Sequence, residues 1–377
     1  MNRNPEFKRI DSLTGLRFFF IITIVLSHFE FLGGGGGGSN IYDRFFHNGS
    51  IGVVYFFVIS GFGLSYKFNC EKDNRLIAYG VKQSITYGYS RVRKIYGLYI
   101  ATILLMVPTF MCQTYLLGNS IYQVLKKTVV RLLIAIPLLQ SLTGIVSITH
   151  AFNGVAWYLS CALFLYIGYP TIERINQKVF KKAPKIWLLG IMILQILLRC
   201  LLQSAQDTLP FDDLFYSSPI YRVCDFTIGV LVSDLYLIRK KATKDIRDEI
   251  FAWLAFATCI ICYCGRNSFF PGKIELLKDI IERLAVVCLV YSFAIGKSKI
   301  ASFWESRKMV YLGSTATFIF LIHYPIRITS WFWINQVSEN TLYCKSLTVF
   351  LTVAVTVLSI WLIEKKKSHS RRLAELN

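Results

Sequence analysis

Long apolar runs dominate this amino-acid sequence and constrain its fold more than any other feature. Of its 377 residues, 54% are hydrophobic, and they are gathered into runs instead of being spread evenly. A run of about 20 apolar residues crosses a bilayer as an α-helix, because a helix satisfies its own backbone hydrogen bonds in hydrocarbon. The candidate spans lie near 14–33, 50–66, 95–111, 150–170, 186–203, 219–238, 250–264, 279–296, 309–327 and 343–363.

These ten runs predict an all-α, polytopic membrane helix bundle that forms a single domain over 1–377, ending in a basic tail at 364–377. A shorter apolar piece, Arg131 to Leu142, contains Pro137 and is predicted to be a re-entrant or interfacial element. The six-glycine run Gly33 to Gly38 has no helical preference and predicts a flexible linker.

The basic residues indicate how the bundle is oriented. A formal net charge of +20 would suit a nucleic-acid-binding protein, but the Lys and Arg residues fall in alternate loops. The basic segments are 67–94, 171–185, 239–249, 297–308 and the tail, whereas 204–218 and 328–342 contain no Lys or Arg. Because cytoplasmic loops are enriched in these residues, we expect both termini in the cytoplasm. The pattern predicts a multi-pass membrane protein with no nucleic-acid partner, and we expect it in a bacterial cytoplasmic membrane.

Two groups of polar residues are predicted to be structural. Cys259, Cys262 and Cys264 lie in an apolar run without a nearby His or acidic residue, so they indicate core packing and no metal site. Arg222 and Asp225 stand three residues apart at the start of the sixth span and are expected to pair on one helix face.

Arg17 and His28 form the most informative polar pair. They stand eleven residues apart in the first span, GLRFFFIITIVLSHFEFL. Eleven residues of α-helix advance about 20° past three full turns, so the two side chains share one stripe roughly 16 Å apart. An arginine and an imidazole are costly in hydrocarbon, so the stripe is expected to face the protein interior or a polar cavity. The pair indicates a membrane protein that handles a charged ligand.

A basic patch marks the start of the third span. The segment RVRKIYGLY contains Arg91, Arg93 and Lys94 where the chain is expected to leave the cytoplasm. Topological anchoring by itself explains such a patch. Binding of a phosphate-bearing ligand is the alternative reading.

Two further polar patches interrupt apolar spans. They contain His150, Asn153, Trp157 and Tyr158 in the fourth span, and His323 and Tyr324 in the ninth. An interfacial aromatic belt explains the first patch as well as a binding role does. A buried histidine such as His323 is often a satisfied core residue, but inside a membrane a functional role is equally expected.

Five segments in order resemble the acyltransferase family 3 membrane proteins, whose members move acyl groups onto extracytoplasmic glycans. The first, DSLTGLRFFFIITIVLSHF, resembles the opening helix of the family with its Arg-x10-His motif. The second, GVVYFFVISGFGLSY, includes Ser60, and RVRKIY resembles the basic element of the family with Lys94 in place of an arginine. WYLSCALFLY and LGSTATFIFLIHYP complete the resemblance, which covers about 11–363.

This resemblance implies an O-acyltransferase that moves an acyl group, expected to be acetyl, from cytoplasmic acyl-CoA to a hydroxyl of a glycan or lipid-linked sugar outside. Acetyl-CoA is then a co-substrate, and no permanently bound cofactor is expected. The implied catalytic residues are His28, as general base, and Arg17. Acyl-CoA would be bound by Arg91, Arg93 and Lys94. The residues expected at the acceptor or its pocket are Trp157, Tyr158, Asn153, His323, Tyr324 and Ser60.

Two other functions stay open on the residues alone. Intramembrane Arg and His also suit a proton relay, so a transporter or flippase for a polysaccharide precursor is the main alternative. A structural scaffold would leave Arg17, His28 and His323 without a role. Direct transfer and a transient acyl-histidine are both compatible with the sequence.

Overall fold

The computed structural model describes residues 8–33, 41–71, 74–239, 245–269, 275–296 and 298–376. Within them every regular element is helical, as the sequence predicts: fourteen α-helices and four short 3-10 helices. The apolar runs fold this way because helices alone satisfy their backbone within one segment. Most of the glycine run, residues 34–38, lies outside the described residues.

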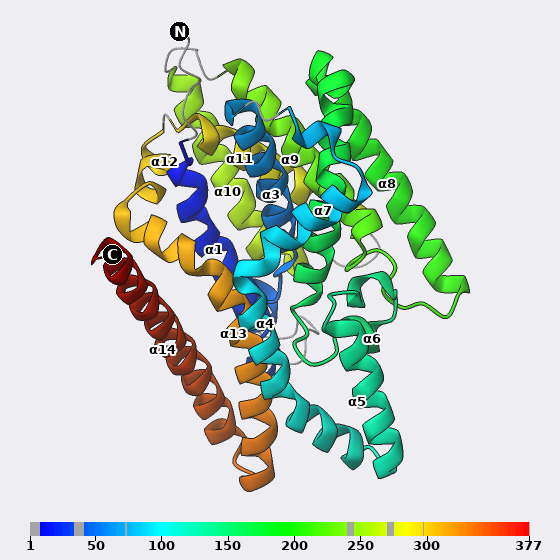
Figure 1. Ribbon diagram of the computed structural model, residues 1–377. Coiled ribbons are helices and arrows are strands. Elements are labelled where there is room, and N and C mark those ends of the chain that lie inside the picture. The colour runs from blue at the N-terminus through cyan, green and yellow to red at the C-terminus, as the bar shows by residue number, and fades with distance from the viewer. Residues whose placement is uncertain are drawn as a thin grey trace.

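Ten long helices coincide with the ten predicted spans (Figure 1). They are α1 (Asp11–Ser27), α3 (Ser50–Glu71), α4 (Val81–Leu116), α7 (Trp157–Lys178), α8 (Pro184–Thr208), α9 (Pro219–Arg239), α10 (Ile246–Phe269), α11 (Glu275–Ile295), α13 (Arg307–Val337) and α14 (Thr341–Leu376). The shorter helices are α2 (Ile41–Phe46), α5 (Ile121–Ala135), α6 (Val146–Thr149) and α12 (Lys299–Trp304).

Six of the long helices in the described part of the chain are long and apolar enough to cross a membrane: α3, α4, α8, α10, α13 and α14. The protein is therefore a polytopic helical membrane protein. Buried charges lower the hydropathy of two others, since α9 and α11 carry an ion-pair cluster inside the bundle. Asp225 lies 2.9 Å from Arg222 and 3.0 Å from Arg283, and Gln195 of α8 donates to the same carboxylate. The predicted pairing of Arg222 with Asp225 is confirmed.

Several predicted boundaries are wrong, and they matter for the site. Helix α4 begins at Val81 and not near residue 95, so the basic patch lies inside a helix and not in a loop. Helix α7 begins at Trp157, and His150 to Ala156 form an irregular approach to it in which Phe152 has a φ of 57°. Helix α14 continues through Leu376, so the backbone of the predicted tail is helical. Helical hydrogen bonding continues past the apolar window, which hydropathy cannot detect.

Two close helix crossings hold the core together. A Cβ on Gly313 of α13 would lie 1.8 Å from the Thr14 carbonyl oxygen of α1, and a Cβ on Gly229 of α9 would lie 1.9 Å from that of Val58 in α3. Only glycine lets the backbones approach this closely, a common device in membrane bundles. The first crossing places α1 beside α13 in the middle of the bundle, whereas α14 lies along α13 at its edge (Figure 1).

Candidate active site

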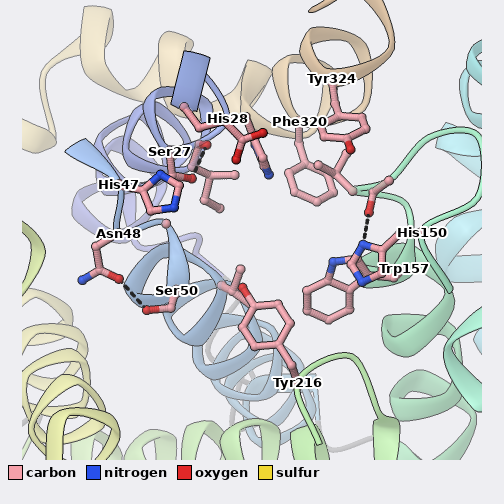
Figure 2. Close-up of a pocket in the computed structure, with 16 residues that line it drawn as sticks. Ser27, His28, His47, Asn48, Ser50, His150, Trp157, Tyr216, Phe320 and Tyr324 are labelled. Atoms are coloured by element: carbon pink, nitrogen blue, oxygen red, sulfur yellow. Dashed lines mark hydrogen bonds between the residues drawn. The ribbon is translucent and has the colours of Figure 1, made fainter. Parts of the chain in front are cut away.

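The histidine cavity is a space of about 380 Å³ at the end of α1. Figure 2 shows its side chains arranged around a central space. Its polar and aromatic lining consists of Ser27, His28, Glu30, His47, Asn48, Ser50, His150, Trp157, Tyr216, Phe320 and Tyr324. Three of the five histidines in the chain therefore meet at one cavity, although they are far apart in the sequence.

His28 lies at the C-terminal end of α1 and contacts α13 on two sides. Its Nδ1 is 3.1 Å from Nε2 of His323, which is almost completely buried. Its ring meets the ring of Tyr324 edge-on, with 5.2 Å between centroids. Just after His28, Glu30 accepts a hydrogen bond from Arg327 at 2.9 Å. These contacts fix the histidine against α13.

A buried carboxylate supports one wall of the histidine cavity. Glu282 of α11 is almost fully buried and accepts hydrogen bonds from Asn48 at 3.1 Å and from Ser50 at 2.9 Å. The Ser50 hydroxyl also lies 2.7 Å from the Asn48 amide oxygen, so the two acceptors share its one hydrogen (Figure 2). Side chains held by buried hydrogen bonds keep a fixed geometry, so this wall presents polar groups in set positions.

The opposite wall is formed by two loops. His150 Nδ1 lies 3.0 Å from the Gly154 carbonyl oxygen, and its Nε2 lies 3.4 Å from the buried carboxylate of Asp213. Asp212 binds the backbone N–H of Val146 at 2.6 Å, which joins the two loops. The Trp157 ring stands between them, 6.3 Å from the imidazole of His150.

The cation cavity, of about 300 Å³, lies on the other side of Ile24. Its lining combines apolar residues with Arg17, Ser60, Arg91, Lys94, Tyr158, Tyr166 and Thr317. The Arg17 Nε is buried, and no hydrogen bond to it is made within the described part of the chain. Arg91 donates to the Tyr87 hydroxyl at 2.7 Å, and both Arg91 and Lys94 are exposed. Three cations thus border one cavity.

A narrow neck separates the two cavities. Both are lined by Ile24 of α1, Val53 of α3 and Phe320 of α13. Gly52 brings α3 against this point, because a Cβ there would lie 2.8 Å from the Ile24 side chain. Arg17 and His28 face different cavities on either side of Ile24, as expected for two residues on one helix stripe.

The structure distributes the predicted site residues over three places. His28, Trp157 and Tyr324 line the histidine cavity, whereas Arg17, Arg91, Lys94, Tyr158 and Ser60 line the cation cavity. Asn153, His323 and Arg93 line neither. Asn153 is buried and donates to Thr102 at 2.9 Å and to the Leu321 carbonyl at 3.0 Å, so it ties α4 to α13. Arg93 is exposed like Arg91, but it does not line the cation cavity, because a helical residue two positions from Arg91 points to another face.

Sequence reasoning missed His47, Asn48, Ser50 and Tyr216, which lie in or beside short connections. His47 is one of only five histidines, and that rarity was the available signal. The described residues contain no group of three or more His, Cys, Asp or Glu side chains placed to hold a metal ion.

Comparison with known proteins gives the family. Residues 10–364 match the acyltransferase 3 family, Acyl_transf_3, described as an acyltransferase domain. The chain is also similar to the acyltransferase MdmB of Streptomyces mycarofaciens, at 24% identity over 244 residues and 61% of this chain. The matched region spans 58% of that relative's length. No solved structure matches. Since the family match covers nearly the whole helical bundle, the chain belongs to the acyltransferase 3 family of membrane proteins.

Proposed function

We propose that this protein transfers an acyl group, acetyl in the simplest case, from acyl-CoA to a hydroxyl of a glycan or lipid-linked sugar. The cation cavity would hold the donor, and the histidine cavity would hold the acceptor. Family membership supports the reaction class, and the presence of two cavities supports separate sites for donor and acceptor.

One observation carries the proposal: a cavity bordered by cations meets a cavity bordered by histidines at a neck of three residues. Coenzyme A carries several phosphate charges on one end and its thiol on the other, joined by a long flexible arm. Arg91 and Lys94 are exposed at the cation cavity and suit the phosphates. The arm would pass Arg17 and bring the thioester to the neck, next to His28.

The reaction then needs only one base. A neutral His28 accepts the proton of the acceptor hydroxyl while the oxygen attacks the thioester carbonyl carbon. The C–S bond breaks, and the coenzyme A thiolate takes the proton from the imidazolium. The products are the acyl ester and free coenzyme A, and His28 returns to its neutral form.

The histidine cavity suits a sugar ring. Trp157 and Tyr216 lie 5.2 Å apart between ring centroids, and Tyr324 lines the same space. Aromatic faces pack against the apolar C–H groups of a sugar, and Asn48, Ser50 and His150 offer polar groups to its hydroxyls. This combination of a few polar groups and aromatic surface supports a carbohydrate acceptor.

Replacement of His28 tests the proposal. His28→Ala should lose roughly 10²–10⁴-fold in acyl transfer, the usual contribution of a positioned base. His28→Gln keeps hydrogen bonding but cannot take up the proton, so it should be about as inactive. Transfer of radiolabelled acetyl from acetyl-CoA to methyl hexopyranosides measures this in detergent, and acetyl-CoA binding to each variant controls for folding.

Near wild-type transfer by His28→Gln would rule out the base. Failure of wild-type protein to bind acetyl-CoA would overturn the proposed donor and favour the transporter alternative.

A further inference from the structure

We infer that His323 is a positioning residue that fixes the tautomer of His28 and so makes it a base on the side of the histidine cavity. This inference rests on the proposed function and adds a residue that does not itself line the cavity. It is carried by a chain of two short contacts that run from the α13 backbone to His28.

The first contact sets the proton on His323. Its Nδ1 lies 2.8 Å from the Ile319 carbonyl oxygen, one helical turn earlier in α13. A carbonyl oxygen can only accept a hydrogen bond, so Nδ1 of His323 must carry the proton. In the neutral imidazole the other nitrogen, Nε2, is then an acceptor.

The second contact determines which ring nitrogen of His28 carries the proton. Nε2 of His323 lies 3.1 Å from Nδ1 of His28. Since Nε2 accepts, Nδ1 of His28 must donate, and the lone pair of neutral His28 is left on its Nε2. The partner of one ring nitrogen decides which form the other takes, as in other histidine sites.

The surroundings hold this arrangement in place. His323 is 1% exposed, so its ring is shielded from bulk solvent. Ile319, His323 and Arg327 follow one another at intervals of four residues on one stripe of α13. Arg327 holds Glu30, two residues after His28, at 2.9 Å. One helix face therefore positions His28 twice, through its ring and through the segment that follows it.

The contact also assists the proton transfer. When His28 Nε2 takes the acceptor proton, both of its nitrogens carry hydrogen, and Nδ1–H stays bonded to His323. A hydrogen bond from a charged donor is stronger than one from a neutral donor, so the contact stabilises the imidazolium more than the neutral ring. The proton itself stays on His28, and His323 does not touch the reacting atoms.

Two variants of His323 separate positioning from packing. His323→Leu fills the space without an acceptor, and we expect kcat to fall roughly 10- to 100-fold, as for other residues that orient a reactive group. The KM for acetyl-CoA should stay within about twofold of wild type, because the donor cavity is untouched. His323→Gln supplies an oxygen that can accept from His28 Nδ1–H, so part of the lost kcat should return. Transfer of radiolabelled acetyl to methyl hexopyranosides gives these values.

A double variant distinguishes more sharply between positioning and packing roles of His323. If His323 acts only through His28, His28→Ala/His323→Leu should transfer acetyl no more slowly than His28→Ala alone. A role in packing would instead add its loss to that of His28→Ala. Additive losses, or equal rates for the Leu and Gln variants, would overturn the inference.

A second measurement does not depend on acyl transfer. Diethyl pyrocarbonate modifies the unprotonated nitrogen of an imidazole, and mass spectrometry of the His28 peptide reports its rate. We expect His323→Leu to slow modification of His28 several-fold and His323→Gln to restore it. The modification rates of His28 can change as predicted while neither wild type nor any variant transfers acetyl. In that case the proposed function fails and the tautomer assignment stands. An unchanged rate in His323→Leu overturns the assignment.

Discussion

Arg17 is a cation held inside the bundle without an anionic partner in the part of the chain that is described. Its Nε is buried and makes no hydrogen bond there, although a buried polar atom without a partner is costly. Arg222, by contrast, is paired with Asp225 at 2.9 Å. Arg222 therefore serves the fold, and for Arg17 we propose the binding of an anionic ligand. Since Arg17 stands about 16 Å along the helix from His28, it suits donor binding better than contact with the reacting atoms.

The basic residues of the cation cavity give a prediction with an internal control. Arg91→Ala and Lys94→Ala should each weaken acetyl-CoA binding by about 1.5–3 kcal/mol, roughly 10- to 150-fold in Kd. Arg93→Ala removes the same charge from the same helix but faces away from the cavity, so its Kd should stay near wild type. All three positions are exposed, and unfolding free energy should change by less than about 0.5 kcal/mol. If a binding titration gives the same Kd for all three variants, the basic patch serves only to anchor the membrane topology.

At the scale of elements, three helices meet to form the neck between the cavities. Ile24, Val53 and Phe320 come from α1, α3 and α13, and the first two are almost fully buried. On the proposed function, an acyl group that moves from the cation cavity to His28 passes these three side chains. The width of an unbranched acyl chain does not depend on its length. A neck therefore discriminates between acyl groups by their branching and ring size.

Widening the neck should therefore admit broader acyl groups. Val53→Ala should raise the affinity for isobutyryl-CoA relative to acetyl-CoA by about tenfold, the scale on which apolar pockets discriminate a methylene group. Val92→Ala is the matched control, because Val92 is equally buried but lines only the cation cavity. Competition against labelled acetyl-CoA measures both ratios. The same shift in both variants would show that the neck does not select the acyl group.

At the scale of the whole molecule, the helix directions agree with alternating membrane crossings. Helix α1 runs parallel to α13, since Gly15 lies near Gly313 and His28 near His323. Helix α4 also runs parallel to α13, because Asn153 bridges Thr102 to residue 321 and Trp333 binds Thr109. These are the first, third and ninth predicted spans. Shared direction among odd spans agrees with alternating crossings, and the basic loops lead us to propose that both termini lie in the cytoplasm.

Cysteine labelling tests this orientation. Lys82→Cys at the start of α4 should react with a membrane-impermeant maleimide only after the cells are permeabilised, and Asp207→Cys should react in intact cells. Both sites are exposed, and Cys200, the exposed native cysteine, is first replaced by Ser. Asp212 is less suitable, because its carboxylate binds the backbone N–H of Val146. Reversed labelling would place the cation cavity outside and remove the cytoplasmic donor.

The class of the fold and the polar stripe of α1 follow from residues that are close together in the sequence. Apolar runs of about 20 residues form helices in a membrane, because a helix satisfies its backbone hydrogen bonds within one segment. The eleven-residue spacing predicted that Arg17 and His28 face one side, and both border cavities. Local physics suffices here, since hydropathy and helical pitch depend only on residues close in the chain.

Tertiary structure alone decided which residues meet. Nothing in the sequence joins His28 to His323, 295 residues later, or brings His47, His150 and Tyr216 to one cavity. Those contacts depend on close crossings such as Gly313 against α1, where the absence of a side chain sets the separation of two helices. Helix periodicity predicts which face of its own helix a residue occupies, but it does not predict which other helix packs against that face. His28 could therefore be named as a candidate base from the sequence, whereas its contact with His323 could not.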